Sequence, residues 1–344
     1  MSITQAFSQL KNKIFNGKNP KFVYYIKAYA ALATPRCLLR PRVKYLDRIL
    51  DKRPDREYIL DRVNYYCRAE SYSGTSRDKW SQESCPLCRQ PMTRQKVYYL
   101  DSMPLARHFP ANLRWRLLHG DIDYVPDVPS IVKSRPIEGM PGADDVRNSI
   151  LLKLDKVRHF IFVKDNIPFR DKADRAIFRG KIGNKQPRID FMRMYYGNAR
   201  VDAGAIDNVE PEWVTPKMPI HAHLKYRYIM AIEGNDVASN LKWVMSSNSI
   251  AVMPRPTCET WFMEGRLRPG YHYIEVKPDF SDLIAQLDHY SAHPDEAEAI
   301  IRHAHEYVDQ FRDKRREKLI SLLVLRKYLN GVEKISDEPN TPPS

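Results

Sequence analysis

The sequence predicts an α/β fold built around a parallel sheet, and three observations support this prediction. Between residues 174 and 310, short apolar runs alternate with amphipathic stretches long enough to form helices. Two of the apolar runs end at Gly180 and Gly234, which is typical of a strand that leads into a turn. Hydrophobic residues make up 43% and charged residues 28% of the 344 residues, as in folded globular proteins. We therefore expect parallel strands with helices on both faces of the sheet.

The individual elements follow from periodicity and from helix-terminating residues. Pro187 near the start and Gly197 at the end delimit the first helix of this half. Apolar runs predict strands at 175–180, 199–204, 223–234, 249–254 and 272–276. Helical periodicity predicts helices at 186–197, 238–248, 260–265, 281–291 and 294–311.

The first half of the chain is less regular. Residues 1–60 predict basic helices broken by prolines, and the polar residues 68–95 predict a long loop or hairpin. The alternating run at 96–101 and the apolar run at 159–163 predict two strands. Residues 121–142 contain many prolines, so we expect an extended chain there, because the residue before a proline avoids the helical region.

The net charge of +14 is compatible with nucleic acid, anionic lipid or phosphorylated substrates as partners. The first 44 residues contain basic but no acidic residues, and apolar residues such as Phe22 and Tyr29 lie among them. This segment could lie on an anionic membrane surface, or it could pack its apolar side on the protein body. No run approaches the roughly 18–20 apolar residues of a membrane span, and the N-terminus lacks a signal-peptide pattern. We expect a cytoplasmic protein that is peripheral on the inner membrane.

The five cysteines do not form the pattern of a disulfide framework. Cys85 and Cys88 have the spacing of a zinc knuckle, and Cys67 lies nearby in the sequence. A fourth zinc ligand would have to be Cys37 or a histidine such as His108. Because no second close pair of cysteines exists, reduced thiols without zinc are the favoured interpretation.

Two predicted strand-to-helix turns carry groups that suit a phosphate. The turn "FRGKIGNKQPR" at 178–188 combines glycines with cations, and "EGNDVASNLK" at 233–242 places polar residues at a helix start. Glycines allow a ligand to approach the backbone, and cations and helix N-termini favour a diphosphate. Neither turn matches the GxGxxG or P-loop pattern. Each could be an ordinary turn with solvated lysines, but two in one half favour phosphate binding. The candidate residues are Arg179, Gly180, Lys181, Arg188, Gly234, Ser239, Asn240 and Lys242.

Residues 174 to about 310 resemble the glycosyltransferase family 90 domain. The similar segments are "FRG" with the downstream Arg188, "VDA" at 201–203, residues 224–252 and residues 266–283. Upstream, "VPDVPSIVKSRPI" at 125–137 is a weaker match. The whole chain is most similar to the bacterial lipopolysaccharide branch of the family.

This resemblance implies a GT-B-like architecture, with two Rossmann-like domains and a cleft between them. It also implies inverting, metal-independent transfer of a hexose from a UDP-sugar to a lipopolysaccharide core acceptor, with no cofactor. The expected organisation is a basic helical segment at 1–60, an acceptor-side domain at 61–165, a nucleotide-sugar domain at 166–310, a C-terminal helix at 311–335 and a disordered tail at 336–344. In the absence of a metal, cations must stabilise the leaving diphosphate.

The resemblance further implies an aspartate base from the first half of the chain, and Asp127 in "PDVP" is the nearest match. Asp121 and Asp123 remain alternatives. An arginine is common in the family where this chain has Asn240, whose amide brings no positive charge to a phosphate. Glu259 is a further candidate, for ribose or sugar hydroxyls. The sequences "DID" at 121–123 and "ADD" at 143–145 are only weak matches to the DxD motif that holds a metal.

Two alternative functions follow from the same residues. The charge and the basic N-terminus are also compatible with a nucleic-acid-binding protein without enzymatic activity, although no recognised binding motif is present. A sugar-phosphate enzyme such as a kinase is a third interpretation, against which the missing P-loop weighs. The transferase interpretation explains the two turns and the order of the similar segments together.

Overall fold

The computed structural model describes residues 21–72 and 74–337 and divides the chain into two compact units. Unit 1 contains Val157–Pro256 and Glu264–Gln310. Unit 2 contains Phe22–Lys156, Thr257–Met263 and Phe311–Ser344. The chain therefore passes between the units several times, and a short segment in its second half belongs to the unit formed by its first half.

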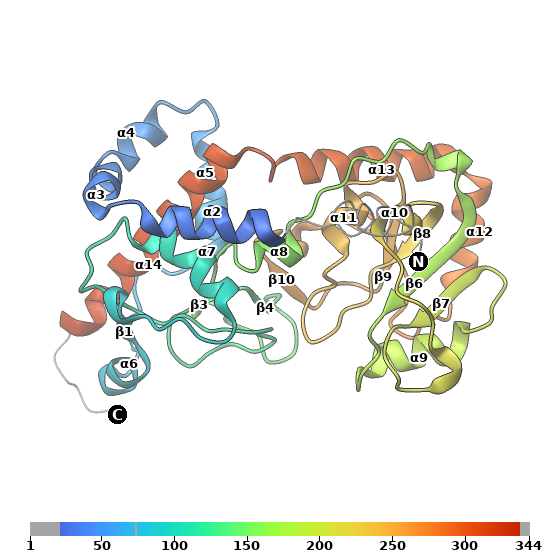
Figure 1. Ribbon diagram of the computed structural model, residues 1–344, viewed down its shortest axis with the longest axis horizontal. Helices are drawn as coiled ribbons and strands as arrows, with labels where there is room; N and C mark the ends of the chain where they lie inside the picture. Colours follow the sequence, from blue (N-terminus) through green and yellow to red (C-terminus); the bar gives the residue numbers. More distant parts are fainter. Residues whose placement is uncertain (1–20, 73, 338–344) are drawn as a thin grey trace, which may run out of the picture. The chain divides into compact units, whose positions relative to one another are not determined.

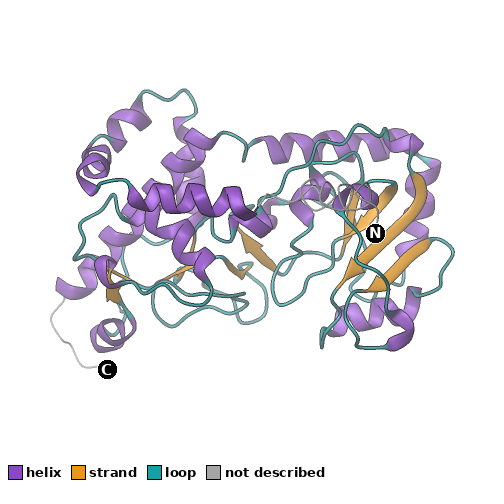
Figure 2. Cartoon of the chain, viewed as in Figure 1, coloured by secondary structure: helices purple, strands orange, loops and turns teal. Residues whose placement is uncertain are grey.

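Unit 1 contains the parallel sheet that the sequence predicts (Figures 1 and 2). Its five strands are arranged in the order β11-β9-β8-β6-β7, and each neighbouring pair is parallel. The strands are β6 (Ala173–Gly180), β7 (Val201–Ala205), β8 (Tyr226–Met230), β9 (Ile250–Met253) and β11 (Ile274–Glu275).

The strand order creates a switch point in the sheet. The chain runs from β6 outward to β7, then returns to the other side of β6 to form β8, and continues outward to β9 and β11. This is the doubly wound order 2-1-3-4-5, in which connections leave the first and third strands in opposite directions. The carboxyl ends of β6 and β8 are therefore neighbours at the point where open α/β sheets bind ligands.

Helices cover both faces of this sheet. Apolar residues of α9 and α12, such as Phe191 and Leu287, share one buried cluster with alternate strand residues such as Phe178 and Val252. Helix α11 packs against β9, and its buried residues lie outside that cluster, on the opposite face. The helices of unit 1 are α8 (Lys156–His159, which begins at the unit boundary), α9 (Gln186–Tyr195), α10 (Ile220–His223), α11 (Leu241–Met245), α12 (Leu283–Ala292) and α13 (Pro294–Asp309), with 3-10 turns η2 (Phe169–Asp171), η3 (Pro211–Trp213) and η4 (Glu264–Arg266).

Two predicted elements in this part of the chain are wrong. The strand predicted at 159–163 is an irregular segment after α8, where Val163 donates its N–H to the Ser246 hydroxyl and not to a neighbouring strand. The helix predicted at 260–265 is the end of strand β10 (Cys258–Thr260) followed by a turn. Both runs are apolar because their residues are mostly buried or half-buried, and burial alone does not determine the backbone conformation.

Unit 2 is mostly helical, with short strands. Its helices are α2 (Lys21–Ala33), α3 (Arg36–Lys44), α4 (Leu46–Asp51), α5 (Arg56–Tyr66), α6 (Arg77–Glu83), α7 (Lys96–Ala106) and α14 (Lys314–Asp337), with the 3-10 turn η1 (Leu87–Arg89). Its strands are β1 (Cys85–Pro86), β2 (Arg114–Trp115), β3 (Ser130–Val132), β4 (Ser134–Pro136), β5 (Ser149–Leu151) and β10. These strands have two or three residues each, whereas β6 of unit 1 has eight, a difference that Figure 2 shows.

The strands of unit 2 pair only two by two in the described part of the chain. β1–β2 and β4–β10 are antiparallel, and β3–β5 is parallel. No longer parallel sheet of the Rossmann type occurs among the described residues of this unit. The prolines in the extended region 121–142 explain the short strands, because proline cannot donate a ladder hydrogen bond.

The strand predicted at 96–101 is wrong, since these residues form the first half of α7. Tyr98, Asp101, Ser102 and Leu105 are buried, at helical spacing. The neighbouring tyrosines and Val97 favoured a strand locally, but tertiary packing selected the helix. The loop predicted at 68–95 also contains α6, β1 and η1.

The ends of the chain are described in part. In the described part of the predicted basic segment, the first helix is α2 from Lys21, and α14 extends to Asp337, two residues into the predicted disordered tail. The predictions for residues 1–20 and 338–344 lie outside the described residues. In the described ranges, none of the helices combines the length and the apolar character that a membrane crossing requires.

Candidate functional site

The candidate site lies at the carboxyl ends of β6 and β8, where the two turns singled out from the sequence meet. β6 and β8 are paired in parallel, with Ile177 opposite Ile229, so both turns leave the same edge of the sheet. The turn after β6 leads into α9, and the turn after β8 leads into α11. This edge is the switch point of the sheet, where ligands of open α/β proteins bind.

The turn after β6 is fixed by hydrogen bonds to the residues that follow β7. Asp207 accepts hydrogen bonds from the backbone N–H groups of Ile182 (2.9 Å) and Gly183 (2.8 Å). Gly183 has a φ of +56°, a left-handed conformation that glycine adopts at low cost. The turn is therefore held in one shape before any ligand binds. Sequence reasoning missed Asp207, whose only signal was its place just after a predicted strand.

Arg188 joins the two turns. Its Nη1 donates to the carbonyl oxygen of Lys181 (2.7 Å), Nη2 to that of Ile232 (2.8 Å), and Nε to that of Glu233 (3.0 Å). Burial lowers the pKa of this guanidinium, although the nearby Asp207 and Glu233 act in the opposite direction. Within the described ranges no carboxylate forms an ion pair with it. Arg188 therefore brings a cation, surrounded by neutral carbonyls, to the switch point.

Gly234 makes room for this guanidinium. A Cβ atom at position 234 would lie 2.9 Å from Arg188 Nη2 and 3.3 Å from its Cζ. Such contacts are shorter than van der Waals distances, so any side chain at this position would displace the arginine. The glycine was predicted to allow close approach of a ligand, and the group that approaches it in the structure is Arg188.

The remaining residues of the second turn have structural partners. Asn240 donates its amide N–H to the carbonyl of Met230 at the end of β8 (2.9 Å). Lys242 is fully buried in α11, and its ammonium lies 2.5 Å from the Glu264 carboxylate. The positive charge of Lys242 is thus balanced by Glu264. Ser239 is exposed at the start of the turn into α11.

Arg179 at the end of β6 turns toward β7. Its guanidinium lies 2.5 Å from the Asp202 carboxylate and donates to the Asp202 backbone carbonyl (2.7 Å). Tyr226 also donates its hydroxyl to this carboxylate. Burial opposes ionisation of Asp202, but Tyr226 and Arg179 outweigh it and keep its pKa below the ordinary value. Arg179 and Lys242 are thus paired with different carboxylates.

Gly180 and Lys181 follow Arg179 in the first turn. Lys181 is exposed, and its backbone carbonyl is one of the three that bind Arg188. A Cβ atom at Gly180 would lie 2.9 Å from the Phe178 ring, so packing of that ring favours glycine. The structure therefore brings Gly180, Lys181, Arg188 and Gly234 together, with Arg188 at their centre.

Glu259 belongs to unit 2, not to the unit with the parallel sheet. It lies in β10 opposite Arg135 of β4, and its carboxylate is 2.8 Å from that guanidinium. Tyr65 donates its hydroxyl to the second oxygen of Glu259. Both members of the ion pair are almost completely buried. The sequence could not indicate this partnership, because 124 residues separate Arg135 from Glu259.

Asp127 lies in an exposed loop of unit 2, before β3. Lys79 donates to its carboxylate at 2.5 Å, and this hydrogen bond holds the pKa of the carboxyl below its ordinary value. The amide of Asn148 donates to the backbone carbonyls of Pro126 and Asp127, both at 3.1 Å. The aspartate is therefore ionised and its backbone is anchored. Sequence reasoning missed both Lys79 and Asn148.

The two alternative aspartates differ in their surroundings. Asp121 is paired with the buried Lys133 ammonium, and Asp123 is exposed. Of the three, Asp127 combines an exposed carboxylate with an anchored backbone.

The cysteines are all free thiols. Cys85 and Cys88 lie at β1 and η1, and the proposed fourth ligand His108 is buried with its Nδ1 on the carbonyl of Leu39 (2.9 Å). Within the described ranges, one group of three side chains could jointly hold a metal ion, and it contains no cysteine: His289, His293 and Glu296.

The fold and the site define an α/β protein with an anion-compatible switch point between two parallel strands. The family model described as "Glycosyl transferase family 90" matches residues 151–319, which include all five strands of the sheet. The chain belongs to glycosyl transferase family 90 and is a glycosyltransferase.

Two relatives extend this result. The chain is 37% identical over 319 residues to "O-glucosyltransferase LpsA" of Dichelobacter nodosus, covering 91% of this chain and 96% of the relative. It is 26% identical over 140 residues to "Protein O-glucosyltransferase 3" of Rattus norvegicus, covering 38% of this chain and 27% of that relative. The first similarity extends over both units of this chain, so the relative contains segments that correspond to each unit. These findings do not support the alternative of a nucleic-acid-binding protein without enzymatic activity.

Proposed function

We propose that this enzyme transfers a glucosyl residue from UDP-glucose to a hydroxyl group of a lipopolysaccharide core acceptor, with inversion and without a metal. Family membership supports the transfer, and the name of the Dichelobacter relative favours glucose over galactose. The similarity to the lipopolysaccharide branch supports the acceptor. The observation that carries the proposal is Arg188, a half-buried cation at the switch point of a family 90 sheet, with which none of the described carboxylates forms an ion pair.

In this proposal unit 1 binds the donor and unit 2 binds the acceptor, the division of labour of a GT-B-like enzyme. The diphosphate of UDP lies at the turns after β6 and β8. The Arg188 guanidinium lies next to this diphosphate, and the ammonium of the exposed Lys181 can bind the diphosphate oxygens that face solvent. Cations and backbone N–H groups stabilise a leaving diphosphate without a metal when they are held in place beforehand. The Asp207 hydrogen bonds and the three carbonyls on Arg188 provide this preorganisation.

Asp127 is the proposed base. Its carboxylate takes the proton of the acceptor hydroxyl as the oxygen attacks the anomeric carbon of glucose. The new bond between this oxygen and the anomeric carbon forms while the bond to the UDP oxygen breaks, and UDP leaves with that electron pair. Attack from the face opposite UDP inverts the configuration. Asn148, which anchors the backbone at 126–127, positions the base.

A transfer assay with radiolabelled donors tests the activity. We expect UDP-glucose to be used in preference to UDP-galactose, with lipopolysaccharide core as acceptor, and the rate to be retained in EDTA. A requirement for added Mg²⁺ or Mn²⁺ would overturn the metal-independent mechanism. No transfer from any UDP-sugar would overturn the donor assignment.

Asp127→Asn tests the base. Removing the proton acceptor should lower kcat by about 10²–10⁴-fold. Asp123→Asn, in the same loop and also exposed, is the matched control and should retain wild-type kcat. Equal rates in wild type and Asp127→Asn, with a loss in Asp123→Asn or Asp121→Asn, would transfer the role to one of these neighbours.

We also propose that α2 places the enzyme on an anionic lipid surface such as the inner membrane. Phe22, Ile26 and Tyr29 recur at helical spacing and are 75%, 52% and 46% exposed. Lys21 and Lys27 lie on the same helix, which contains no acidic residue. Apolar side chains next to cations are the features of a helix that binds the surface of an anionic bilayer.

Vesicle sedimentation tests this contact. The full chain should bind vesicles that contain phosphatidylglycerol and not vesicles of phosphatidylcholine alone. Phe22→Ser with Ile26→Ser should reduce the binding, whereas Met194→Ser, at a similarly exposed apolar residue of unit 1, should not. Equal binding of both vesicle types, or of both variants, would contradict the proposal.

A further inference from the structure

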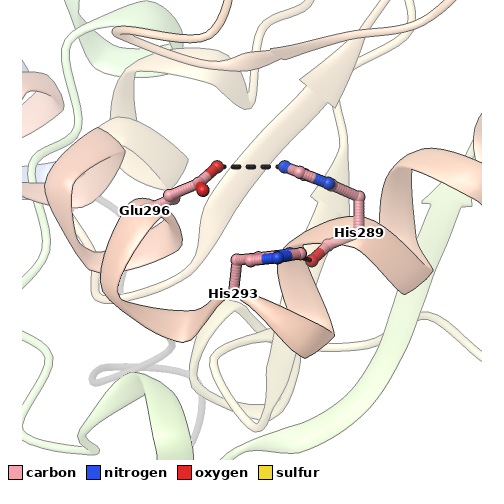
Figure 3. A group of neighbouring side chains, drawn as sticks. All are labelled: His289, His293 and Glu296. Atoms are coloured by element: carbon pink, nitrogen blue, oxygen red, sulfur yellow. Dashed lines mark hydrogen bonds and ion pairs between the residues drawn. The ribbon is translucent and has the colours of Figure 1, made fainter.

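Three side chains with metal-binding atoms meet at the corner between α12 and α13 (Figure 3). His289 and His293 lie four residues apart at the end of α12, and Glu296 lies in the first turn of α13. Each residue offers one possible metal-ligand atom, and these three atoms all lie within 4.8 Å of one another. All three side chains are exposed, so an ion could reach them from solvent.

The hydrogen bonds of the two histidines indicate which ring nitrogen each can present to a metal ion. Nδ1 of His293 lies 2.8 Å from the backbone carbonyl of His289. A carbonyl only accepts, so Nδ1 carries the proton and the neutral ring presents the Nε2 lone pair. Metal-binding histidines in proteins typically donate their second N–H to a carbonyl in this way. His289 donates its Nε2–H to the Glu296 carboxylate at 2.9 Å, so a metal ion that binds this nitrogen displaces the proton to solvent. The two imidazole rings stack with their centroids 4.5 Å apart.

The backbone of this corner is rigid. His293 donates its N–H to the His289 carbonyl, which ends α12, and its own carbonyl accepts from Glu296 (3.1 Å) and Ala297 (3.2 Å) at the start of α13. Pro294 occupies the first turn of α13, and Ala297 is fully buried in the core of the unit. The three donor residues therefore extend from a corner that is held in place by the fold.

The corner lies at the opposite edge of the sheet from the switch point. Ser291, two residues after His289, donates to Asp174 near the start of β6 (2.6 Å). Asp288 forms an ion pair with Arg200, which directly precedes β7 (3.0 Å). The cluster is therefore at the amino-terminal edge of the strands. A ligand here would not contact a donor at the carboxyl ends of β6 and β8.

We propose that His289, His293 and Glu296 form a binding site for a divalent first-row transition-metal ion of the Zn²⁺ class. Two imidazoles and one carboxylate suit Zn²⁺, Ni²⁺ or Cu²⁺, whereas Mg²⁺ and Ca²⁺ select oxygen ligands. Metal–nitrogen bonds of about 2.0–2.1 Å require the three side chains to move together, a torsional change open to exposed side chains. Water completes the coordination. The ion joins α12 to α13 and stabilises the folded chain by mass action.

Calorimetric titration of the full chain, treated first with EDTA and then freed of it, tests this site. Zn²⁺ or Ni²⁺ should bind with a stoichiometry of one, and Mg²⁺ should not. His289→Ala with His293→Ala should lose affinity by more than the roughly 10–100-fold that changes beside a metal ligand cause. His221→Ala, an exposed histidine of the same unit, is the matched control and should bind like wild type. Equal affinity in the double variant would overturn the proposal.

Two further measurements separate this site from other binding. The Co²⁺ complex should show no thiolate charge-transfer band; a band that Cys37→Ser or Cys88→Ser removes would assign the metal to the exposed thiols and overturn the proposal. Zn²⁺ should raise the Tm of wild type and of His221→Ala but not that of the double variant. An equal rise in all three proteins would contradict a site at this corner.

The proposal is independent of the transfer mechanism. We expect the double variant to transfer glucose at the wild-type rate, because its substitutions lie at the other edge of the sheet. A transferase that requires Mg²⁺ would overturn metal-independent transfer and leave this site intact. A metal that binds elsewhere would overturn this site and leave the transfer mechanism intact.

Discussion

Two arginines that lie fully or partly inside the fold, one in each unit, have different partners. In unit 2, Arg62 is fully buried and lies 2.6 Å from Glu317, which also accepts from Lys153 (3.0 Å) and from the Trp261 indole (2.6 Å). In unit 1, Arg188 donates to three backbone carbonyls, and among residues 21–72 and 74–337 no carboxylate is paired with it. The first arginine has a direct ion pair within the fold, whereas the carboxylates near the second, Asp207 and Glu233, make no direct contact with its guanidinium.

This difference separates a structural cation from one that can bind a ligand. A buried ion pair has its charges satisfied internally, and breaking it leaves an uncompensated charge. A guanidinium among carbonyls retains a net charge that an anion at the switch point can balance. Lys242 and Arg179 are each paired with a carboxylate, so Arg188 is the better candidate for binding the diphosphate.

Glu317→Gln should have the largest effect on stability. It leaves the buried Arg62 and the partly buried Lys153 without their carboxylate, at an expected cost of about 3–5 kcal/mol in the free energy of unfolding. Urea unfolding followed by tryptophan fluorescence measures this. Glu333→Gln, an exposed position on the same helix, is the control and should change little. A loss below 1 kcal/mol would mean that the network contributes little to the fold.

The pH dependence of stability should reflect the same network. Burial alone would raise the pKa of Glu317, but Lys153 and Arg62 outweigh it and the pKa lies below its ordinary value. The contribution of Glu317 is therefore complete above the pKa of about 4.3 of an unfolded glutamate and is lost as the pH falls through the lower folded pKa. Wild type and Glu317→Gln should converge in stability in acid.

Arg188→Lys should have the largest effect among substitutions at the turns after β6 and β8. Lysine keeps the charge but cannot bind three carbonyls with a planar fork. We expect kcat/KM for UDP-glucose to fall by about 100-fold, the order found when one preorganised donor is removed from a transition-state site. Arg193→Lys, on the exposed side of the same helix, should retain wild-type kinetics. Unchanged kinetics in both variants would remove Arg188 from the donor site.

Gly234→Ala should have a smaller effect of the same kind. Its methyl group would displace the guanidinium, and we expect about a tenfold rise in the Kd for UDP, equivalent to about 1.4 kcal/mol. In the Arg188→Lys background the same substitution should cost much less, because residues in contact are coupled. An equal rise in the Kd for UDP in the two backgrounds would show that Gly234 does not act through its contact with Arg188.

Asp55→Asn should have the smallest effect. Asp55 lies 2.6 Å from Arg53 and 3.3 Å from Arg316, and the hydrogen bond from Arg53 lowers its pKa to about 2. Partly exposed ion pairs contribute roughly 0–1 kcal/mol. Thermal unfolding should show this difference at neutral pH, and it should vanish as the pH falls from 4 toward 2. A loss of stability as large as that caused by Glu317→Gln would show that buried and partly exposed ion pairs contribute equally to the free energy of unfolding.

The sequence predicted the sheet of unit 1 because each strand is a short apolar run that ends at a turn. It also indicated the two turns, which the parallel pairing of β6 and β8 brings to one edge of the sheet. It could not assign the cations within those turns, because the partners of Lys242 and Arg179 are carboxylates more than 20 residues away. Lysines and arginines in a turn look alike until their partners are known.

The sequence was least informative in unit 2. Residues 96–101 contain tyrosines and a valine that favour a strand, and only their contacts select α7. The role of Glu259 was assigned from its neighbours in sequence, whereas its partner Arg135 comes from the first half of the chain. Long-range pairing of this kind leaves no local pattern to detect.

The passage of Thr257–Met263 into unit 2 limits how the protein can be divided. β10 pairs with β4, and Trp261 stacks on Tyr66 at 3.9 Å. A recombinant fragment that starts at residue 166 would contain these residues without β4 and without Tyr66. The Glu259 carboxylate and the Trp261 indole would then be exposed to solvent, and the fragment would tend to aggregate. Swapping donor-binding halves between related transferases would therefore require exchanging this seven-residue segment separately, together with its partners in the first half.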